Sequence, residues 1–143
     1  MFRVLRGPHG ERHGHLNLLR IRPGPLARLL AGEIVEADLA AGDLFSASER
    51  EMATSLYIES IAVENVEPQS RSPAVRAILL HFIDAAGLLD PVGKVEEIHA
   101  MAATAAGARF LTRLGLKEIG STGFYAGPYA TFIEGIGRSC YRR

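Results

Sequence analysis

The chain has 143 residues, enough for one domain with a hydrophobic core and too few for two. Sixteen lysine and arginine residues balance sixteen aspartate and glutamate residues, so no net charge directs the protein toward nucleic acid. No uninterrupted apolar run approaches the roughly 18 residues of a membrane-spanning helix, so we expect no membrane partner. The single cysteine, Cys140, excludes an intramolecular disulfide framework and favours a reducing, cytoplasmic location.

The first 55 residues combine short strand patterns with turn-forming residues. Residues 2–5 and 15–21 are predicted strands, and the intervening Gly7-Pro8-His9-Gly10 turn favours a hairpin. Prolines 23 and 25 then end the second strand, because proline cannot donate to a strand ladder. We expect short helical segments at residues 26–30 and 36–45, followed by a connection over residues 46–54.

A strand pattern at residues 56–63 precedes a long amphipathic helix. The strand is apolar on both faces, which predicts a central, covered position in a sheet. The helix is predicted over residues 72–87, with Ser72 as its N-cap, Pro73 at its first position and Gly87 at its end. Unpaired N–H groups at a strand-loop-helix junction favour anions, so we expect a ligand that carries phosphate.

The last third continues the alternation of strands and helices. We predict a strand at residues 94–101, a helix at 104–114, strands at 116–120 and 129–134, and a basic tail at 135–143. This order predicts an α/β (α+β) fold with a mixed central sheet and flanking helices. The strands at 56–63 and 94–101 should be parallel and joined by a right-handed crossover.

Two segments resemble the GNAT N-acetyltransferase superfamily. The run Arg71-Ser72-Pro73-Ala74-Val75-Arg76, with Leu79-Leu80 after it, resembles the Gln/Arg-x-x-Gly-x-Gly/Ala loop that wraps the pyrophosphate of acetyl-CoA. Ala74 and Arg76 stand in place of the two glycines. The alternative register Gln69-Ser70-Arg71-Ser72-Pro73-Ala74 keeps the final small residue, whereas the leucine pair favours the first register. Residues 108–116 resemble the family's Phe-Tyr-x-Lys-Leu-Gly-Phe segment.

The resemblance implies one GNAT-like acyl-CoA-binding domain over residues 1–143, with a core at 56–134 and a divergent or truncated N-terminal part at 1–55. It implies transfer of an acyl group from acetyl-CoA to an amine acceptor, either a small molecule or a peptide. Thr104 stands where the family usually has an asparagine, and peptide groups after the middle of the first core strand pair with the pantetheine arm. The residues implied in cofactor binding are Ile61, Ala62, Val63, Arg71, Ser72, Pro73, Ala74, Val75, Arg76 and Thr104.

Acyl transfer to an amine needs a base, and Glu59 is the candidate. It lies in mid-strand among apolar neighbours, where desolvation makes a carboxylate a better proton acceptor. The alternative is that Glu59 reaches solvent or an arginine. Leu111 occupies the position of the tyrosine that often protonates the thiolate in the family; Tyr125 and Tyr129 are substitutes, although buried packing tyrosines are the more common case.

A second function of another class stays open. A GNAT-fold protein that has lost the glycines and the tyrosine would be a catalytically impaired binding or dimerisation module, with a homodimer formed through an exposed apolar strand edge at residues 129–133. His9, His13 and His15 lie close in sequence, but no acidic or cysteine residue completes a metal-ligand spacing. We expect them in a solvated hairpin.

Overall fold

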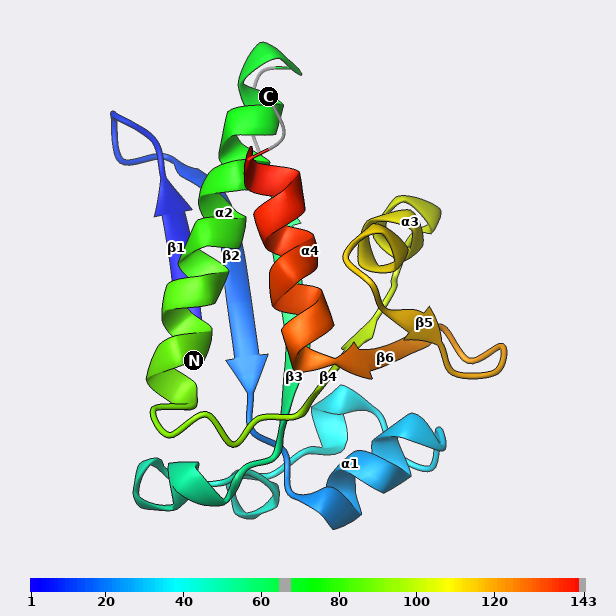
Figure 1. Ribbon diagram of the computed structural model, residues 1–143. Coiled ribbons are helices and arrows are strands. Elements are labelled where there is room, and N and C mark those ends of the chain that lie inside the picture. The colour runs from blue at the N-terminus through cyan, green and yellow to red at the C-terminus, as the bar shows by residue number, and fades with distance from the viewer. Residues whose placement is uncertain (65–67, 142–143) are drawn as a thin grey trace.

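The computed structural model describes residues 1–64 and 68–141, and of residues 68–71 the backbone alone. Within these residues it has one six-stranded mixed sheet and four α-helices, as the predicted α/β (α+β) class requires (Figure 1). The strands are β1 Phe2–Arg6, β2 Arg12–Leu19, β3 Ser55–Val63, β4 Glu97–Met101, β5 Lys117–Glu118 and β6 Phe124–Pro128. The helices are α1 Pro23–Leu30, α2 Pro68–Leu89, α3 Ala105–Arg113 and α4 Tyr129–Tyr141.

The strands lie in the order β1-β2-β3-β4-β6-β5. β1 and β2 form the predicted antiparallel hairpin, and β2 pairs antiparallel with β3. β3 and β4 are parallel, as predicted, and α2 connects them. β3 is therefore an inner strand with neighbours on both sides, which agrees with its apolar sequence.

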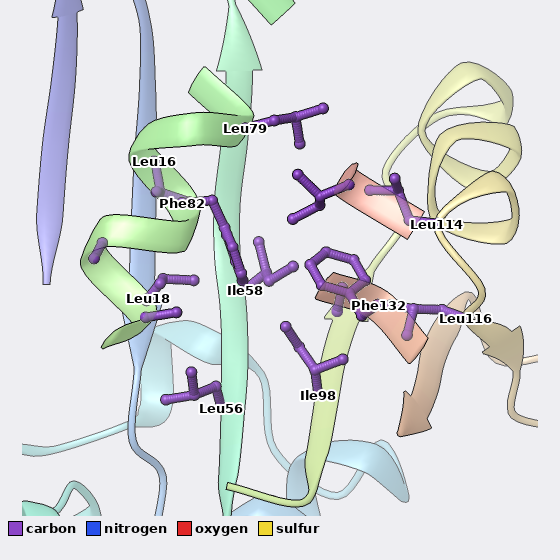
Figure 2. Packing of buried hydrophobic residues seen from close by; sticks show 14 of the residues in the cluster. Leu16, Leu18, Leu56, Ile58, Leu79, Phe82, Ile98, Leu114, Leu116 and Phe132 are labelled. Atoms are coloured by element: carbon purple, nitrogen blue, oxygen red, sulfur yellow. The ribbon is translucent and has the colours of Figure 1, made fainter. Parts of the chain in front are cut away.

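The main core lies between the sheet and α2, with α4 beside α2 on the same face (Figure 1). Phe82 of α2 and Phe132 of α4 meet edge to face, with ring centroids 5.1 Å apart. Leu16 and Leu18 of β2 and Leu56 and Ile58 of β3 belong to the same buried cluster (Figure 2). Because consecutive residues of a strand face opposite sides, Tyr57 lies on the other face of the sheet.

That other face carries a smaller apolar cluster, covered by residues 23–54. α1 begins at Pro23, three residues earlier than predicted, because proline suits the first turn of a helix. It ends before Gly32, whose φ of +73° suits glycine. In place of the helix predicted at 36–45, short 3-10 turns occupy Glu36–Asp38 and Ala41–Asp43, and a third follows at Ala47–Met52. The buried members of this cluster are Ile21, Leu26, Leu29, Tyr57 and Phe124.

α2 is longer than predicted at both ends. It begins at Pro68 rather than Ser72, so Pro73 lies inside the helix and Ser72 is not its N-cap. A proline in the first turn lacks only an N–H that would be unpaired there, so Pro68 begins the helix rather than preventing it. Gly87 does not end the helix, because the apolar stripe continues to the buried Leu89.

The stretch Ser72–Leu89 has the length and mean hydropathy, 1.4, of a helix that could cross a membrane. Here its apolar stripe packs on the sheet, with Ile78, Phe82 and Leu89 in the main core. Core helices and membrane helices both meet this criterion, so the composition of α2 does not assign it to a membrane.

The prediction for the C-terminus is wrong. The last strand, β6, ends at Pro128, and the predicted strand at 129–134 and most of the predicted basic tail form the helix α4. Its buried side chains, Phe132, Ile136 and Cys140, recur every four residues, which is helical rather than strand spacing. The strand edge expected at residues 129–133 is therefore absent, and residues 142–143 lie outside the described part.

Candidate functional site

The parallel strands β3 and β4 pair over only part of their length. Residues 55–58 of β3 oppose residues 97–100 of β4, after which β3 continues to Val63 while β4 ends at Met101. Within the described residues, the second half of β3 thus has a strand partner on its β2 side alone. We call the open space between residues 59–63 of β3 and the end of β4 the wedge.

A β-bulge lies where the wedge begins. Asn17 of β2 opposes Ser60 and Leu18 opposes Ile58, so Glu59 is an extra residue without an opposite partner. A bulge bends its strand and increases the local twist, which turns the second half of β3 away from β4. The candidate base thus lies at the residue where the strand bends.

The direction of the backbone groups on β3 follows from one hydrogen bond. The Glu64 N–H donates to the His13 carbonyl of β2 at 2.7 Å. Along a strand, backbone groups on the same side recur every second residue, so those of Ala62 also face β2. The N–H and C=O groups of Ile61 and Val63 therefore face the wedge. Of the three predicted backbone contacts, these two lie on the open side.

A cavity of about 470 Å³ fills the wedge. Its walls come from β3, from the end of β4 and the turn after it, and from inward-facing residues of α2 and α3. Small residues after β4, including Ala102, Ala103 and Gly107, leave the space open. The lining residues are Ile58, Glu59, Ser60, Ile61, Ala62, Val63, Val75, Ile78, Ala100, Met101, Ala102, Ala103, Thr104, Ala106, Gly107, Phe110 and Leu111. An apolar cavity with few polar groups is typical of small-molecule sites.

Glu59 lines this cavity and is partly exposed. Its Oε2 accepts a hydrogen bond at 3.1 Å from Nδ2 of Asn17, across the bulge. Its described hydrogen-bond partner is thus an amide and not an arginine. The bond fixes the side chain while leaving the other carboxylate oxygen available to a ligand.

Tyr57 and Glu36 form a second polar contact near Glu59, on the face of the sheet opposite α2. The Tyr57 hydroxyl donates to a carboxylate oxygen of Glu36, which comes from the segment between β2 and β3. Burial raises the pKa of Tyr57, and the charges of Glu36 and Glu59 raise it further. Sequence reasoning missed the Asn17–Glu59 and Tyr57–Glu36 contacts, because each joins residues that are far apart in the sequence.

The start of α3 closes one end of the cavity. Thr104 is its N-cap, and its Oγ1 accepts a hydrogen bond from the Gly107 N–H at 3.0 Å. The helix ends at Arg113, before Gly115, whose φ is +97°. Thr104 also lines the cavity, and its hydroxyl is already used to cap the helix. Leu111 is buried, so the position expected to hold a tyrosine holds a packing residue.

The predicted phosphate loop is helical in this structure. Because α2 begins at Pro68, the N–H groups of Ser72 and Val75 belong to the helix ladder and do not face a ligand. Val75 lines the wedge cavity, whereas Ser72 and Arg76 line a second cavity. Ala74 is buried and Pro73 is exposed. The side chain of Arg71 lies outside the described part.

Two tyrosines and three histidines weighed from the sequence lie elsewhere. Tyr125 is buried in the main core on β6, and burial and Asp90 raise the pKa of Tyr129 at the start of α4. Neither lines the wedge cavity as the described residues define it. His99 is buried in β4. His13 and His15 lie beside single carboxylates, Glu11 and Glu64, at 3.0 and 3.2 Å.

Comparison of the chain with protein-family models, with curated proteins and with solved structures gave no match. We therefore infer the function from the wedge and the residues around it.

Proposed function

We propose that this protein is a GNAT-like N-acyltransferase that takes an acetyl group from acetyl-CoA and transfers it to an amine. The observation that carries the proposal is the wedge. There, the backbone groups of Ile61 and Val63 border an apolar cavity that has Glu59 at one end. A pantetheine arm is an extended chain with amide groups, so it can pair with an open strand edge as an added strand would.

The arrangement of elements around the wedge supports the same proposal. β3, α2, β4 and α3 follow one another in the order expected from the family resemblance, with β3 and β4 parallel. In open α/β sheets, ligands bind beyond the carboxyl ends of the strands, and the wedge lies at the carboxyl ends of β3 and β4.

The chemistry assigned to Glu59 follows from its position. An amine is protonated at neutral pH, so it must lose a proton before its nitrogen attacks the thioester carbonyl. The Glu59 carboxylate, held by Asn17, accepts that proton directly or through water. The nitrogen–carbon bond then forms, the carbon–sulfur bond breaks, and the thiolate takes up a proton. The acceptor is a small-molecule or peptide amine.

One observation favours a second function. The described residues that line the wedge cavity include no tyrosine, and Leu111 fills the position expected to hold one. A protein that binds acetyl-CoA without rapid transfer fits this lining. Residues 129–133 are helical, so the strand edge through which a homodimer was expected to form is absent.

The test is release of free thiol from acetyl-CoA in the presence of a panel of small and peptide amines. Glu59→Gln keeps the acceptor oxygen for Asn17 and removes the base, so we expect turnover to fall by about 100-fold or more. Acetyl-CoA affinity should change little. The matched control is Glu64→Gln, which removes a carboxylate five residues along that pairs with Arg12 and His15 and does not line the cavity.

Equal turnover of the wild-type protein and Glu59→Gln would show that Glu59 is not the base. Binding of acetyl-CoA with no thiol release for any amine would favour the second function. An absence of acetyl-CoA binding would contradict both.

A further inference from the structure

A second cavity of about 260 Å³ lies among three helices. Figure 1 shows the C-terminal end of α4 beside the first half of α2, with α3 on the other side of α4. The polar residues that line this cavity are Ser72 and Arg76 of α2, Arg113 of α3 and Ser139 of α4. Three elements that are far apart in the sequence thus supply hydrogen-bond donors to one space.

The charge of this lining is positive. Arg76 and Arg113 both line the cavity, and no acidic residue does among those described. Within the same part of the chain, neither arginine forms an ion pair with a carboxylate. Both arginines are exposed, so their guanidinium groups are accessible to an anion that enters the cavity.

The arginines have different structural surroundings. Arg113 lies in the last turn of α3, where a positive charge also stabilises the helix end. Arg76 lies away from both ends of α2, and its described contact is the ring of the exposed Tyr141, 5.7 Å from its guanidinium carbon. Stabilisation of a helix end therefore explains the position of Arg113 but not that of Arg76.

The two cavities are neighbours. Val75 and Phe110 line both, one from α2 and one from α3. Leu79, one turn after Val75, lines the second cavity and lies on the side of α2 that faces α4 (Figure 2). A ligand whose apolar arm lies in the wedge would therefore have the arginines of the second cavity close to one end of that arm.

We propose that the second cavity binds phosphate groups through Arg76 and Arg113, with Ser72 and Ser139 as further donors. Side chains from three helices hold the anion, instead of backbone N–H groups at the start of α2. Together with the wedge, this cavity forms one two-part site for a ligand with an apolar arm and a phosphorylated end. The claim that one ligand occupies both cavities rests on the proposed function. The claim that the second cavity binds phosphate does not.

The test measures the binding of inorganic pyrophosphate to the full chain by isothermal titration calorimetry. We expect Arg113→Ala and Arg76→Ala each to weaken pyrophosphate binding by about tenfold or more, since each removes a charge-assisted bond. Arg113→Lys should retain part of the affinity. The matched control is Arg109→Ala, one turn earlier on α3, which removes an exposed arginine that does not line the cavity.

Absence of pyrophosphate binding to the wild-type protein would overturn the proposal. Equal weakening by Arg109→Ala and Arg113→Ala would also overturn it, since the effect would then come from net charge. If pyrophosphate binds but does not compete with acetyl-CoA, the two-part site is wrong. Thermal unfolding of each variant checks that it is folded, and an unfolded alanine variant is replaced by the corresponding glutamine variant.

The sole cysteine supplies a second readout that does not depend on acyl transfer. Cys140 lines the same cavity and is buried, so its labelling by a maleimide requires the end of α4 to open. Pyrophosphate bound between α2, α3 and α4 should slow this labelling several-fold in the wild-type protein and not in Arg113→Ala. Labelling that is unaffected by saturating pyrophosphate would contradict the assigned position.

Discussion

Among single residues, His99 is the buried titratable group with the plainest consequence. It is 5% exposed in β4, its Nδ1 has no hydrogen-bond partner among the described atoms, and its Nε2 lies 3.6 Å from a carboxylate oxygen of the exposed Glu97. Burial lowers the pKa of His99 below its ordinary value of 6.5, although the charge of Glu97 opposes the shift. The imidazole is therefore neutral in the folded protein at neutral pH.

This depressed pKa predicts how stability depends on pH. The unfolded chain takes up a proton as the pH falls through 6.5, whereas folded His99 does not until a lower pH, so acid destabilises the fold in that window. We expect the melting temperature to fall between pH 7 and pH 5, and to fall less in His99→Gln. Parallel pH profiles of the two proteins would contradict the assignment. The comparison is made by thermal denaturation at constant ionic strength.

The sequence allowed Glu59 to be selected, but not its surroundings. A carboxylate in the middle of an apolar strand is visible in the sequence. Its partner Asn17 is 42 residues away, and Glu36 is 21 residues from Tyr57. The bulge leaves Glu59 without an opposite residue on β2. It depends on the pairing of β2 with β3, which local sequence patterns do not encode.

At the scale of elements, α4 depends on close contact between its backbone and the end of α3. A Cβ added to Gly135 would lie 2.5 Å from the carbonyl oxygen of Leu114, whereas one added to Gly137 would meet nothing within 4 Å. Both glycines lie in the same helix, and Gly135 is buried. Replacing each glycine by alanine therefore separates two effects on stability. Both substitutions change helix propensity, but only the one at Gly135 disturbs packing.

We expect Gly135→Ala to lower the free energy of unfolding by about 1–3 kcal/mol, because the methyl group would push α4 away from Leu114. Gly137→Ala should raise it by about 0.5–1 kcal/mol, because alanine favours the helix. Urea denaturation measures both. If Gly135→Ala is as stable as Gly137→Ala, α4 does not pack on Leu114 as described.

Elements were predictable where local signals agreed. The hairpin turn at Gly7-Pro8-His9-Gly10 and the cap and stop of α3 carried clear residue preferences. α4 was misassigned because Thr131, Phe132 and Ile133 favour strands, while its burial on α2 favours a helix. The start of α2 was misplaced because Ser72-Pro73 resembles a helix start, although the helix already begins at Pro68.

For the whole molecule, the parallel order of β3 and β4 was predictable from the crossover rule, but their divergence was not. The wedge exists because the two strands pair over 55–58 and 97–100 and then separate, which depends on long-range pairing and the bulge. The second cavity was also unpredicted, because it requires α4 to lie against α2.

The central claim is that the wedge binds the pantetheine arm of acetyl-CoA. Calorimetric titration of acetyl-CoA into the wild-type protein and two variants at alanine positions of α3 tests it most directly. Ala105 and Ala106 are adjacent, exposed residues of α3, but only Ala106 lines the wedge cavity. We predict that Ala106→Phe fills the cavity and weakens acetyl-CoA binding by about tenfold or more, while Ala105→Phe binds like the wild-type protein. Unchanged affinity in Ala106→Phe, or equal loss in both variants, would contradict the claim.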